Sequence, residues 1–480
     1  MTAPTQQAAN QPSPDLTHEP SGLTQDAKRA MVSQFLGFGL DAYDMALVIV
    51  LAPLLTKVFA TPTSSPAWQY LSVALFYSIT MAARPIGSAI FGHYADKIGR
   101  RRLLVLTIGG VGLMSFVSAF IPTREQVGMG AAYLIFGLIR LVMGIFFGGE
   151  YAVGHAFAIE HAPAARRGAI GGFIQSGFPA GYALASFLVM GLSMLIGEAA
   201  MQQYGWRIMF ATGAVPVLLA IYIRKSLVES PEFERAKKHG TVEKAPFASL
   251  FKPPTVWVFL QVFFFMTGLF LTDYAIYQFI PKILKGTGKF GLSDYTLIYG
   301  VALFCAFVGY NLYGMASDRL GRKRLTMYFC VVVVLVAIPL YQVLINAAYS
   351  RNFRLALVGA MLAGLLKVHW GILPAYLCER FPTKSRSVGS GFGYSAGALV
   401  GGAGITPLVA LFHLMPFIAA IEGPNELWLS ASVVLTIGAV MTFVSLLFSP
   451  ETRMIRLSDV GAAGVVEPAL REGEVRAAVG

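Results

Sequence analysis

Charge is scarce in this sequence. Only 13% of its 480 residues are Asp, Glu, Lys or Arg, whereas 56% are hydrophobic. Soluble domains carry roughly 25% charged and 45–50% apolar residues, so the composition argues against a soluble globular protein. The apolar residues form many runs that reach the about 20 residues needed for one helical crossing of a bilayer. The chain is therefore predicted to be an all-α integral membrane protein that lies in a lipid bilayer.

Cysteine and the usual catalytic patterns are also scarce. The three cysteines, Cys305, Cys330 and Cys378, fall inside apolar runs, which is typical of small buried side chains and not of disulfides or a metal site. The histidines are scattered, and the sequence has no Walker loop and no paired cysteines. We therefore predict no enzyme activity, no catalytic residues, no cofactor and no metal.

The net charge of +12 needs an explanation in a chain with so few charges. In a soluble protein such a charge suggests nucleic acid or an anionic surface as partner. Here the basic residues lie between the apolar runs, and no aromatic and basic surface of the kind that binds single strands is visible. The charge therefore indicates membrane topology, and no nucleic-acid partner is expected.

The apolar runs predict twelve membrane spans, with both termini on the same side. The spans centre on 32–57, 68–92, 103–122, 129–159, 168–196, 206–224, 256–284, 293–316, 325–347, 354–378, 388–414 and 427–448. Short loops rich in Lys and Arg stay in the cytoplasm. If the termini are cytoplasmic, the basic loops at 97–102, 166–167, 319–324 and 380–386 all lie inside. We therefore expect a bacterial-type plasma (inner) membrane protein with both termini in the cytoplasm.

This topology divides the chain into two bundles and three polar segments. The expected parts are a disordered cytoplasmic tail at 1–30, an N-terminal six-helix bundle at 31–224, a cytoplasmic central loop at 225–255, a C-terminal six-helix bundle at 256–448 and a second cytoplasmic tail at 449–480.

The two halves repeat each other in sequence. The loop after span two reads GHYADKIGRRR from Gly92, and the loop after span eight reads GMASDRLGRKR from Gly314. In a second pair of loops, EHAPAARRG begins at Glu160 and ERFPTKSRSVG begins at Glu379. The separation of the two copies along the chain is almost the same in both pairs. Two unrelated patterns at nearly one offset indicate an internal duplication of the kind found in repeat-built transporters.

The duplicated loop resembles the signature loop of the major facilitator superfamily, over about residues 30 to 450. The resemblance implies two pseudo-symmetric six-helix bundles. Physically, Asp96 can bond helix N-termini or arginines across the seam between the halves, and such contacts would have to break for the inside to open. The expected gating residues are Gly92, Asp96, Gly99, Arg100, Glu160, Arg167, Gly314, Asp318, Gly321, Arg322, Glu379 and Arg386. The alternative is plain solvated loop charge.

Several ionisable residues lie inside the predicted spans, where each costs roughly 2.5–3.5 kcal/mol on insertion scales. Asp41 and Asp44 are three residues apart on span one, and Arg140 lies near the middle of span four. An aspartate stays charged beside an arginine and takes up a proton when the two separate in an apolar site. Making and breaking such a pair could couple transport to protons. The alternative is a static pair that holds the helices together.

Local patterns narrow the resemblance. The aspartate of AYDMAL and the arginine of LIRLVMG resemble the pair that couples protons in sugar-porter relatives, which implies that role for Asp44 and Arg140. The DAYD sequence resembles the aromatic acid and sialate proton symporters. RPIG, GGEY and FIQSGFPAGYALAS resemble the sialate:proton and metabolite:proton symporter branches, which carry carboxylates. The proton-coupling candidates are Asp41, Asp44, Arg140 and Glu150.

An anion in a low-dielectric cavity needs a cation, and Arg84 and Lys367 are the preferred candidates. Lys367 and His369 are two residues apart on one helix and point in different directions, so they are not expected to grip one carboxylate together. Relatives of these branches carry an arginine in span eight or eleven that is missing here, which leaves an aromatic acid or a zwitterion open. The candidate substrate contacts are Arg84, Gln175, Tyr182, Asp273, Tyr274, Lys367 and His369.

Together these patterns predict a transporter that imports a small organic acid anion with protons, such as a monocarboxylate, a sialate-like acid or an aromatic acid, by alternating access. The alternative on the same fold is an exporter or a proton-independent carrier of a small metabolite. A membrane enzyme or sensor would show clustered ligands or a soluble domain, and the sequence has neither. The resemblance implies a monomer.

Overall fold

The computed structural model describes residues 23–59, 66–225, 227–286, 290, 292–422, 428–461 and 463–464. Of the two expected tails, residues 1–22 and 465–480 lie outside the described residues. The first tail is shorter than expected, because helix α1 (Gln25–Val50) already begins at Gln25, where the Thr24 hydroxyl accepts a hydrogen bond from the Ala27 N–H at 3.1 Å. The second expected tail includes residues that pack against the protein, as described below.

Long helices make up both halves of the chain. The N-terminal half contains α1, α2 (Ala52–Phe59), α3 (Pro66–Ile98), α4 (Arg100–Ser118), α5 (Arg124–Val127), α6 (Met129–Glu160), η1 (Ala164–Arg166), α7 (Arg167–Ala200), η2 (Met201–Gly205), α8 (Trp206–Thr212) and α9 (Ala214–Lys225). The connection contains α10 (Pro231–Lys238) and α11 (Pro246–Ser249). The C-terminal half contains α12 (Thr255–Gly286), α13 (Leu292–Leu320), α14 (Arg322–Ser350), α15 (Phe353–Leu365), η3 (Val368–Ile372), α16 (Leu373–Arg380), η4 (Thr383–Ser385), α17 (Arg386–His413), α18 (Pro416–Glu422) and α19 (Trp428–Leu447), followed by η5 (Leu457–Asp459).

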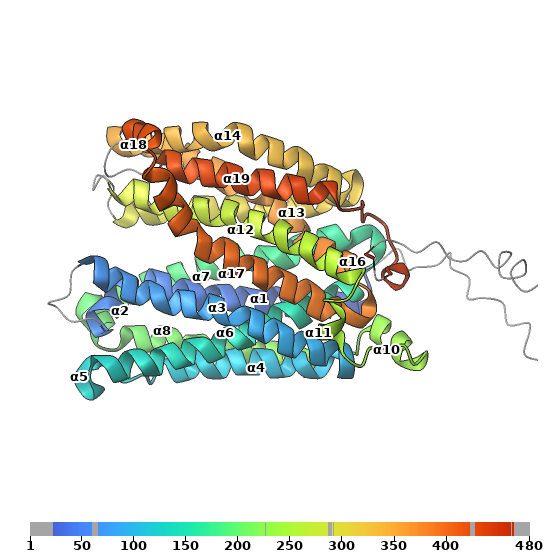
Figure 1. Ribbon diagram of the computed structural model, residues 1–480. Coiled ribbons are helices and arrows are strands. Elements are labelled where there is room, and N and C mark those ends of the chain that lie inside the picture. Colours follow the sequence, from blue (N-terminus) through green and yellow to red (C-terminus); the bar gives the residue numbers. More distant parts are fainter. Residues whose placement is uncertain are drawn as a thin grey trace, which may run out of the picture.

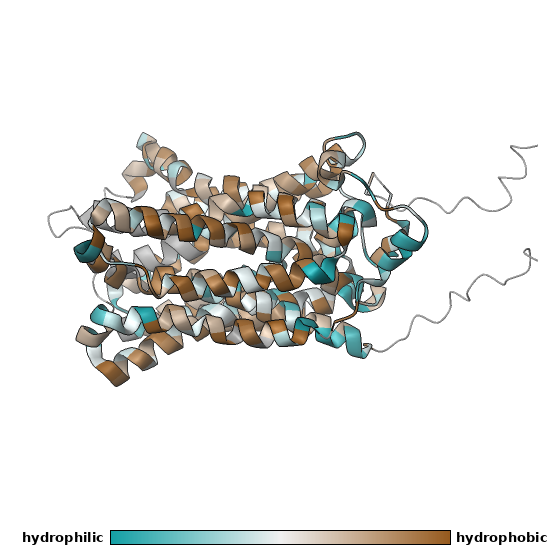
Figure 2. Cartoon of the chain, turned by 90° about the horizontal axis from the view of Figure 1, so that it is seen from below, coloured by the Kyte–Doolittle hydropathy of each residue, from teal (hydrophilic) through white to brown (hydrophobic). Residues whose placement is uncertain are grey.

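These helices agree with the twelve predicted spans. Ten helical segments of the described residues are long and apolar enough to cross a membrane. One of these ten segments, Ala164–Thr212, already includes α8. Helix α3, with 33 residues, and α9, which follows α8, correspond to the other two predicted spans. In Figure 2 apolar residues cover the middle of the bundle, and hydrophilic residues gather at its ends. This is the surface expected of a protein whose sides face hydrocarbon.

The two halves lie side by side. Figure 1 shows α12, α13, α14 and α19 stacked over α3, α4 and α6, with α7 and α17 between them. Helices α7 and α13 approach so closely that a Cβ on Gly314 would meet the Gly168 carbonyl and the Gly172 Cα. On the other side, a Cβ on Gly92 of α3 would meet the Val388 Cα of α17. Glycines therefore permit backbone contact along both seams between the halves.

One end of the bundle carries the duplicated loops. We call this end, formed by residues 92–102, 160–168, 314–324 and 379–388, the basic face. It is the end at which α10, α11 and α16 lie in Figure 1. Predicted span ten is broken on the way to this face: α15 stops at Leu365, a 3-10 turn follows, and α16 resumes at Leu373. Breaks of this kind often mark functional positions in membrane helices, and Lys367 lies in this one.

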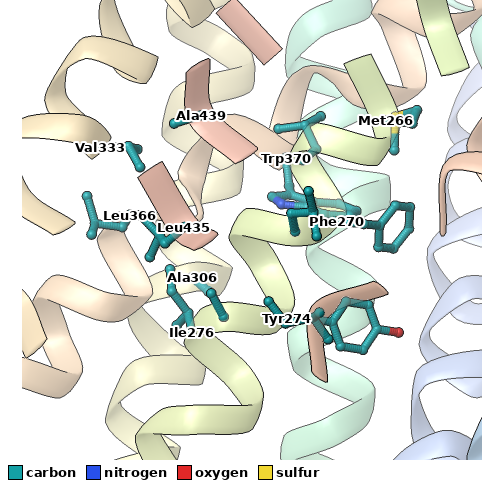
Figure 3. Close-up of a cluster of buried hydrophobic side chains, with 14 of the residues drawn as sticks. Met266, Phe270, Tyr274, Ile276, Ala306, Val333, Leu366, Trp370, Leu435 and Ala439 are labelled. Carbon is teal, nitrogen blue, oxygen red and sulfur yellow. The ribbon is translucent and has the colours of Figure 1, made fainter. Parts of the chain in front are cut away.

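Among the described residues, the largest buried cluster lies mostly in the C-terminal half. It includes Ile276 of α12, Ala306 of α13 and Leu435 of α19. Figure 3 shows that Phe270 and Tyr274, also on α12, project away from the centre of this cluster. Helix α12 therefore packs one face on the centre of the cluster and carries these two aromatic side chains at the edge of the cluster.

Candidate transport site and gate

Two buried ion pairs link α1 to its neighbours. Asp41 pairs with Arg84 of α3, and Asp44 pairs with Arg140 of α6. All four residues are at most 2% exposed, and such charges persist in an apolar interior only when paired and hydrogen-bonded. The predicted Asp44–Arg140 pair is therefore present. Arg84, expected as a contact for the substrate, is already bound to Asp41.

Arg140 is held by more than its aspartate. Its guanidinium lies over the rings of Phe136 and Phe210, with its Cζ 5.0 and 5.2 Å from the ring centroids. Cation–π contacts of this kind stabilise a desolvated arginine. Asp44 has a second partner as well, because the Ser115 hydroxyl donates to it at 3.1 Å. If the ion pair separates, Arg140 can therefore keep its contacts with the two phenylalanine rings, and Asp44 can keep its hydrogen bond from Ser115.

Glu150 lies in a separate network. Its Oε2 accepts hydrogen bonds from Arg224 Nη1 at 2.8 Å and from the Thr107 hydroxyl at 2.9 Å, and Arg224 Nε donates to the Ser33 hydroxyl at 3.0 Å. The partner of Glu150 is therefore Arg224, and its role in proton coupling stays a prediction. Arg224 was not among the predicted site residues, because a basic residue at the end of a span resembles a charge that only sets the membrane topology.

The C-terminal half contributes a third buried pair of this kind. Asp273 of α12 pairs with Lys367 in the break between α15 and η3. The neighbouring Tyr274 reaches across to the N-terminal half, where its hydroxyl lies 2.9 Å from that of Tyr77 on α3. Four of the seven predicted substrate contacts, Arg84, Asp273, Tyr274 and Lys367, thus belong to cross-helix or cross-half contacts near the centre.

An aromatic cluster lies between these charges. It consists of Tyr151 of α6, Phe270 of α12, Trp370 of η3 and Tyr394 of α17. Tyr151 stacks on Tyr394 across the two halves, with ring centroids 3.6 Å apart, and Phe270 lies 5.1 Å from Tyr394 and 5.0 Å from Trp370. Tyr394 lies within electrostatic reach of both Arg84 and Asp273. Among the described residues, the Tyr151 hydroxyl and Trp370 Nε1 are buried without a hydrogen-bond partner.

The other three predicted substrate contacts differ in their surroundings. Gln175 of α7 is buried, and its Oε1 has no hydrogen-bond partner among the described residues. The ring of Tyr182 packs on Phe178, 5.0 Å away. The ring of His369 packs on Phe329 of α14, 5.1 Å away, inside the C-terminal half.

The loops of the basic face join the two halves through helix N-termini. The Asp96 carboxylate accepts hydrogen bonds from the N–H groups of Ser387 and Val388, at 3.1 and 2.9 Å, where α17 begins. The Asp318 carboxylate accepts from the N–H groups of Gly168 and Ala169, both at 2.8 Å, where α7 begins. A carboxylate at a helix N-terminus is favoured by the exposed donors and by the helix dipole. Burial raises the pKa of Asp96, while Arg100 and the two amide donors oppose the rise.

Two glutamates complete these contacts. Glu160 accepts hydrogen bonds from Arg100 of its own half at 3.1 Å and from Arg386 of the other half at 2.8 Å. Glu379 accepts from Arg322 at 3.3 Å and from the Thr452 hydroxyl at 2.7 Å. The two glutamates, Arg100, Arg322 and Arg386 are buried. The alternative of solvated loop charge is therefore excluded, and the halves are in contact at the basic face.

Two further glutamates, which were not predicted from the sequence, accept hydrogen bonds from the first N–H groups of the helices that follow the signature loops. Glu229 accepts from the Arg100 and Arg101 N–H groups, at 3.0 and 3.1 Å, and Glu451 accepts from the Arg322 N–H at 2.7 Å. Their separation along the chain equals that of the two signature loops themselves. That repeated offset was the signal that could have identified them.

Glycine is required at the two corresponding loop positions. Gly99 and Gly321 have φ values of 108° and 94°, in a region that residues with a Cβ rarely adopt. Both stand directly before a capped helix, α4 or α14. The duplicated Gly-Arg sequence thus forms the same turn twice.

Comparison with known sequences gives a consistent picture. A sequence model described as "Major Facilitator Superfamily" matches residues 34–405. The inner membrane metabolite transport protein YhjE of Escherichia coli is 28% identical over 432 residues, which cover 88% of this chain and 94% of that protein. The glycine betaine/proline/ectoine/pipecolic acid transporter OusA of Dickeya dadantii is 28% identical, covering 88% and 83%. The shikimate transporter of E. coli is 27% identical, covering 89% and 95%.

The fold is also found among solved structures. The proton:xylose symporter XylE of E. coli, bound to 6-bromo-6-deoxy-D-glucose, superposes with a TM-score of 0.73 and 19% identity. The match covers 91% of this chain and 98% of that one. The predicted fold of two six-helix bundles is confirmed.

Proposed function

The chain belongs to the major facilitator superfamily, and from that membership we propose that it imports a small organic acid anion together with protons by alternating access. As a member of this family it is an integral membrane transporter of metabolites and not an enzyme. The proposal adds the proton, the carboxylate and the direction. One observation supports it above all: two buried aspartates on α1 are neutralised by arginines from two different helices.

The Asp41–Arg84 pair supports recognition of an anion. Arginine can bind a carboxylate through two parallel hydrogen bonds. Arg84 Nε makes no hydrogen bond within the described part of the chain, so the guanidinium has a donor left for a second carboxylate. A substrate carboxylate that takes over Arg84 would leave Asp41 as an uncompensated buried charge, which favours protonation of Asp41.

The Asp44–Arg140 pair supports proton coupling. The proposal requires that α1 shifts against α6 within the N-terminal half during the transport cycle. If the pair separates, the phenylalanine rings retain Arg140 and Asp44 takes up a proton. Closing the pair again on the other side releases that proton. A cycle of this kind moves one proton for each separation and re-formation of the pair.

The direction of import rests on topology. The basic face carries the Lys- and Arg-rich loops that the positive-inside rule assigns to the cytoplasm. We therefore propose that this face and both termini are cytoplasmic, in a bacterial inner membrane like that of the named relative from E. coli. In this orientation, protons entering along their gradient would carry the anion inward.

The test is substrate-induced proton flux into proteoliposomes that contain the purified protein. Lactate, pyruvate, sialic acid, shikimate, aromatic acids and betaines form the screen, with Asp44→Asn as the matched control. Alkalinisation outside the vesicles on addition of one compound, absent in the control, would support symport and name the substrate. Saturable uptake that ignores a pH gradient would reject proton coupling and favour the alternative, a proton-independent carrier or exporter.

The aromatic cluster favours a second class of substrate, zwitterions that carry an ammonium group beside the carboxylate. Aromatic faces attract quaternary and other ammonium ions, and Asp273 lies within electrostatic reach of Tyr394. One relative is named for glycine betaine and proline. Flux with betaines but not with shikimate, abolished by Tyr394→Leu, would favour this class. Flux with shikimate that tolerates Tyr394→Leu would reject it.

A further inference from the structure

We propose that the segment after the last membrane helix is a strap that holds the two halves together at the basic face and must detach before that face can open. The strap consists of residues 455–461 and 463–464. It begins four residues after Glu451, which accepts a hydrogen bond from the first N–H of α14. In the sequence it looked like part of a polar tail, yet it makes specific contacts with both halves.

Two equivalent arginines bind the strap from opposite sides of the seam. Arg167, at the start of α7, donates a hydrogen bond to the Ile455 carbonyl at 2.5 Å, and Arg386, at the start of α17, donates to the Leu457 carbonyl at 2.7 Å. These arginines are separated along the chain by the same offset as the two copies of the second repeated loop. The strap therefore joins corresponding points of the two halves through alternate carbonyl groups.

Apolar contacts fix the strap between these arginines. Leu457 is 2% exposed and belongs to a buried cluster with Phe91 and Ile170 of the N-terminal half and Cys378 of the C-terminal half. Val460 is also buried. Leu457 thus packs against both halves, and separating them at this face would return it to water.

A further contact anchors the strap to the C-terminal half. Arg380, at the end of α16, donates to the Gly464 carbonyl at 2.5 Å. The half that contains α7 holds the strap through Arg167 and the apolar cluster. When the halves move apart, the strap can stay with only one of them, so its release is part of the opening step. The inference needs only the two-half architecture and is independent of the substrate.

Cys378 provides a native reporter of this step, because it is fully buried in the cluster with Leu457. With Cys305 and Cys330 replaced by serine, alkylation of Cys378 by N-ethylmaleimide measures how often the cluster opens. We expect Leu457→Asp to accelerate alkylation about tenfold or more, since reaction of a buried group follows the open population. The full-length chain with Ser458→Asp is the matched control, because Ser458 is adjacent but exposed.

A second measurement distinguishes a segment that holds the two halves together from one that only shields Cys378 from the reagent. Spin labels at Ile98 and Leu320, exposed residues at the basic-face ends of α3 and α13, report the distance between the halves in a cysteine-free background. The inference requires longer distances in Leu457→Asp, and in a chain that ends at Arg453, than in Ser458→Asp. It is overturned if Cys378 reacts equally fast in all variants. It is also overturned if Cys378 becomes reactive while the distances stay unchanged.

Discussion

At the scale of single residues, variants of Glu150 can distinguish a role in stabilising the fold from a role in proton coupling. It pairs with Arg224 in a fully buried network, and removing one member of such a pair typically costs about 3–5 kcal/mol. We expect Glu150→Gln to lower the thermal unfolding temperature strongly. The double variant Glu150→Leu with Arg224→Met should recover most of the loss, because an apolar pair leaves no buried charge. Thermal unfolding in detergent is the measurement.

The same double variant tests the predicted role of Glu150 in proton coupling. If it still accumulates substrate against a gradient, Glu150 serves the fold alone. If the variant is stable but exchanges substrate without accumulating it, Glu150 belongs to the proton path. Asp44→Asn is the reference for that second behaviour.

Replacing Tyr151 by phenylalanine tests the role of its hydroxyl, because the variant keeps the aromatic ring. The ring stacks on Tyr394, while the hydroxyl is buried without a hydrogen-bond partner in the described structure. We expect Tyr151→Phe to raise the KM for substrate about tenfold or more, since a hydrogen bond to a charged group contributes about 1.5–3 kcal/mol. The unfolding temperature should stay unchanged, because the stacked ring remains. An unchanged KM would mean that the hydroxyl does not contact the substrate.

At this scale the sequence predicted charges better than aromatic residues. A charge inside an apolar run needs a partner, so a pair between an α1 aspartate and Arg140 could be expected, and the family resemblance indicated Asp44. The choice between Asp41 and a substrate as partner of Arg84 could not be predicted. Tyr151, Phe270 and Tyr394 gave no such signal, because aromatic residues in apolar spans are usually core. These residues lie on α6, α12 and α17, and they come into contact only because the three helices pack together in the folded protein.

At the scale of helices, glycine controls how closely α7 and α13 approach. A Cβ on Gly314 would meet backbone atoms of α7, whereas one on Gly300 of the same helix would meet nothing within 4 Å. We expect Gly314→Ala to destabilise the closed basic face by about 1–3 kcal/mol, the usual cost of overpacking. Cys378 alkylation should rise and substrate uptake should fall. Gly300→Ala is the matched control, and equal behaviour of the two variants would contradict the prediction.

Helix boundaries show why parts of the fold could not be read from the sequence. The sequence predicts one continuous helix for span ten, 354–378, but this helix is broken around Lys367. Gly371 packs against the backbone at Tyr310 of α13, and Pro374 stands in the first turn of α16. The irregular turn therefore reflects both a neighbouring helix and a local helix-breaking residue. Gly99 and Gly321, by contrast, were identified from their repeated loop, because the turn itself requires glycine.

At the scale of the whole molecule, duplication makes the two seams comparable. Asp96 caps α17 and Asp318 caps α7 with two hydrogen bonds each. Both contacts form across the halves at the basic face, and we propose that they break together when that face opens. They therefore act on one equilibrium between open and closed states, although they lie on different helices.

Neutralising these caps should shift that equilibrium by comparable and multiplicative factors. We expect Asp96→Asn and Asp318→Asn each to raise the ratio of open to closed molecules about tenfold, equivalent to about 1.4 kcal/mol, because each loses charge-assisted bonds to a helix N-terminus. The double variant should approach the product of the two effects, since the sites share no partner. Distances between spin labels at Ile98 and Leu320 give the populations. A double variant no more open than either single variant would mean that one seam alone controls the gate, and that the duplicated loops, despite their matching geometry, have diverged in function.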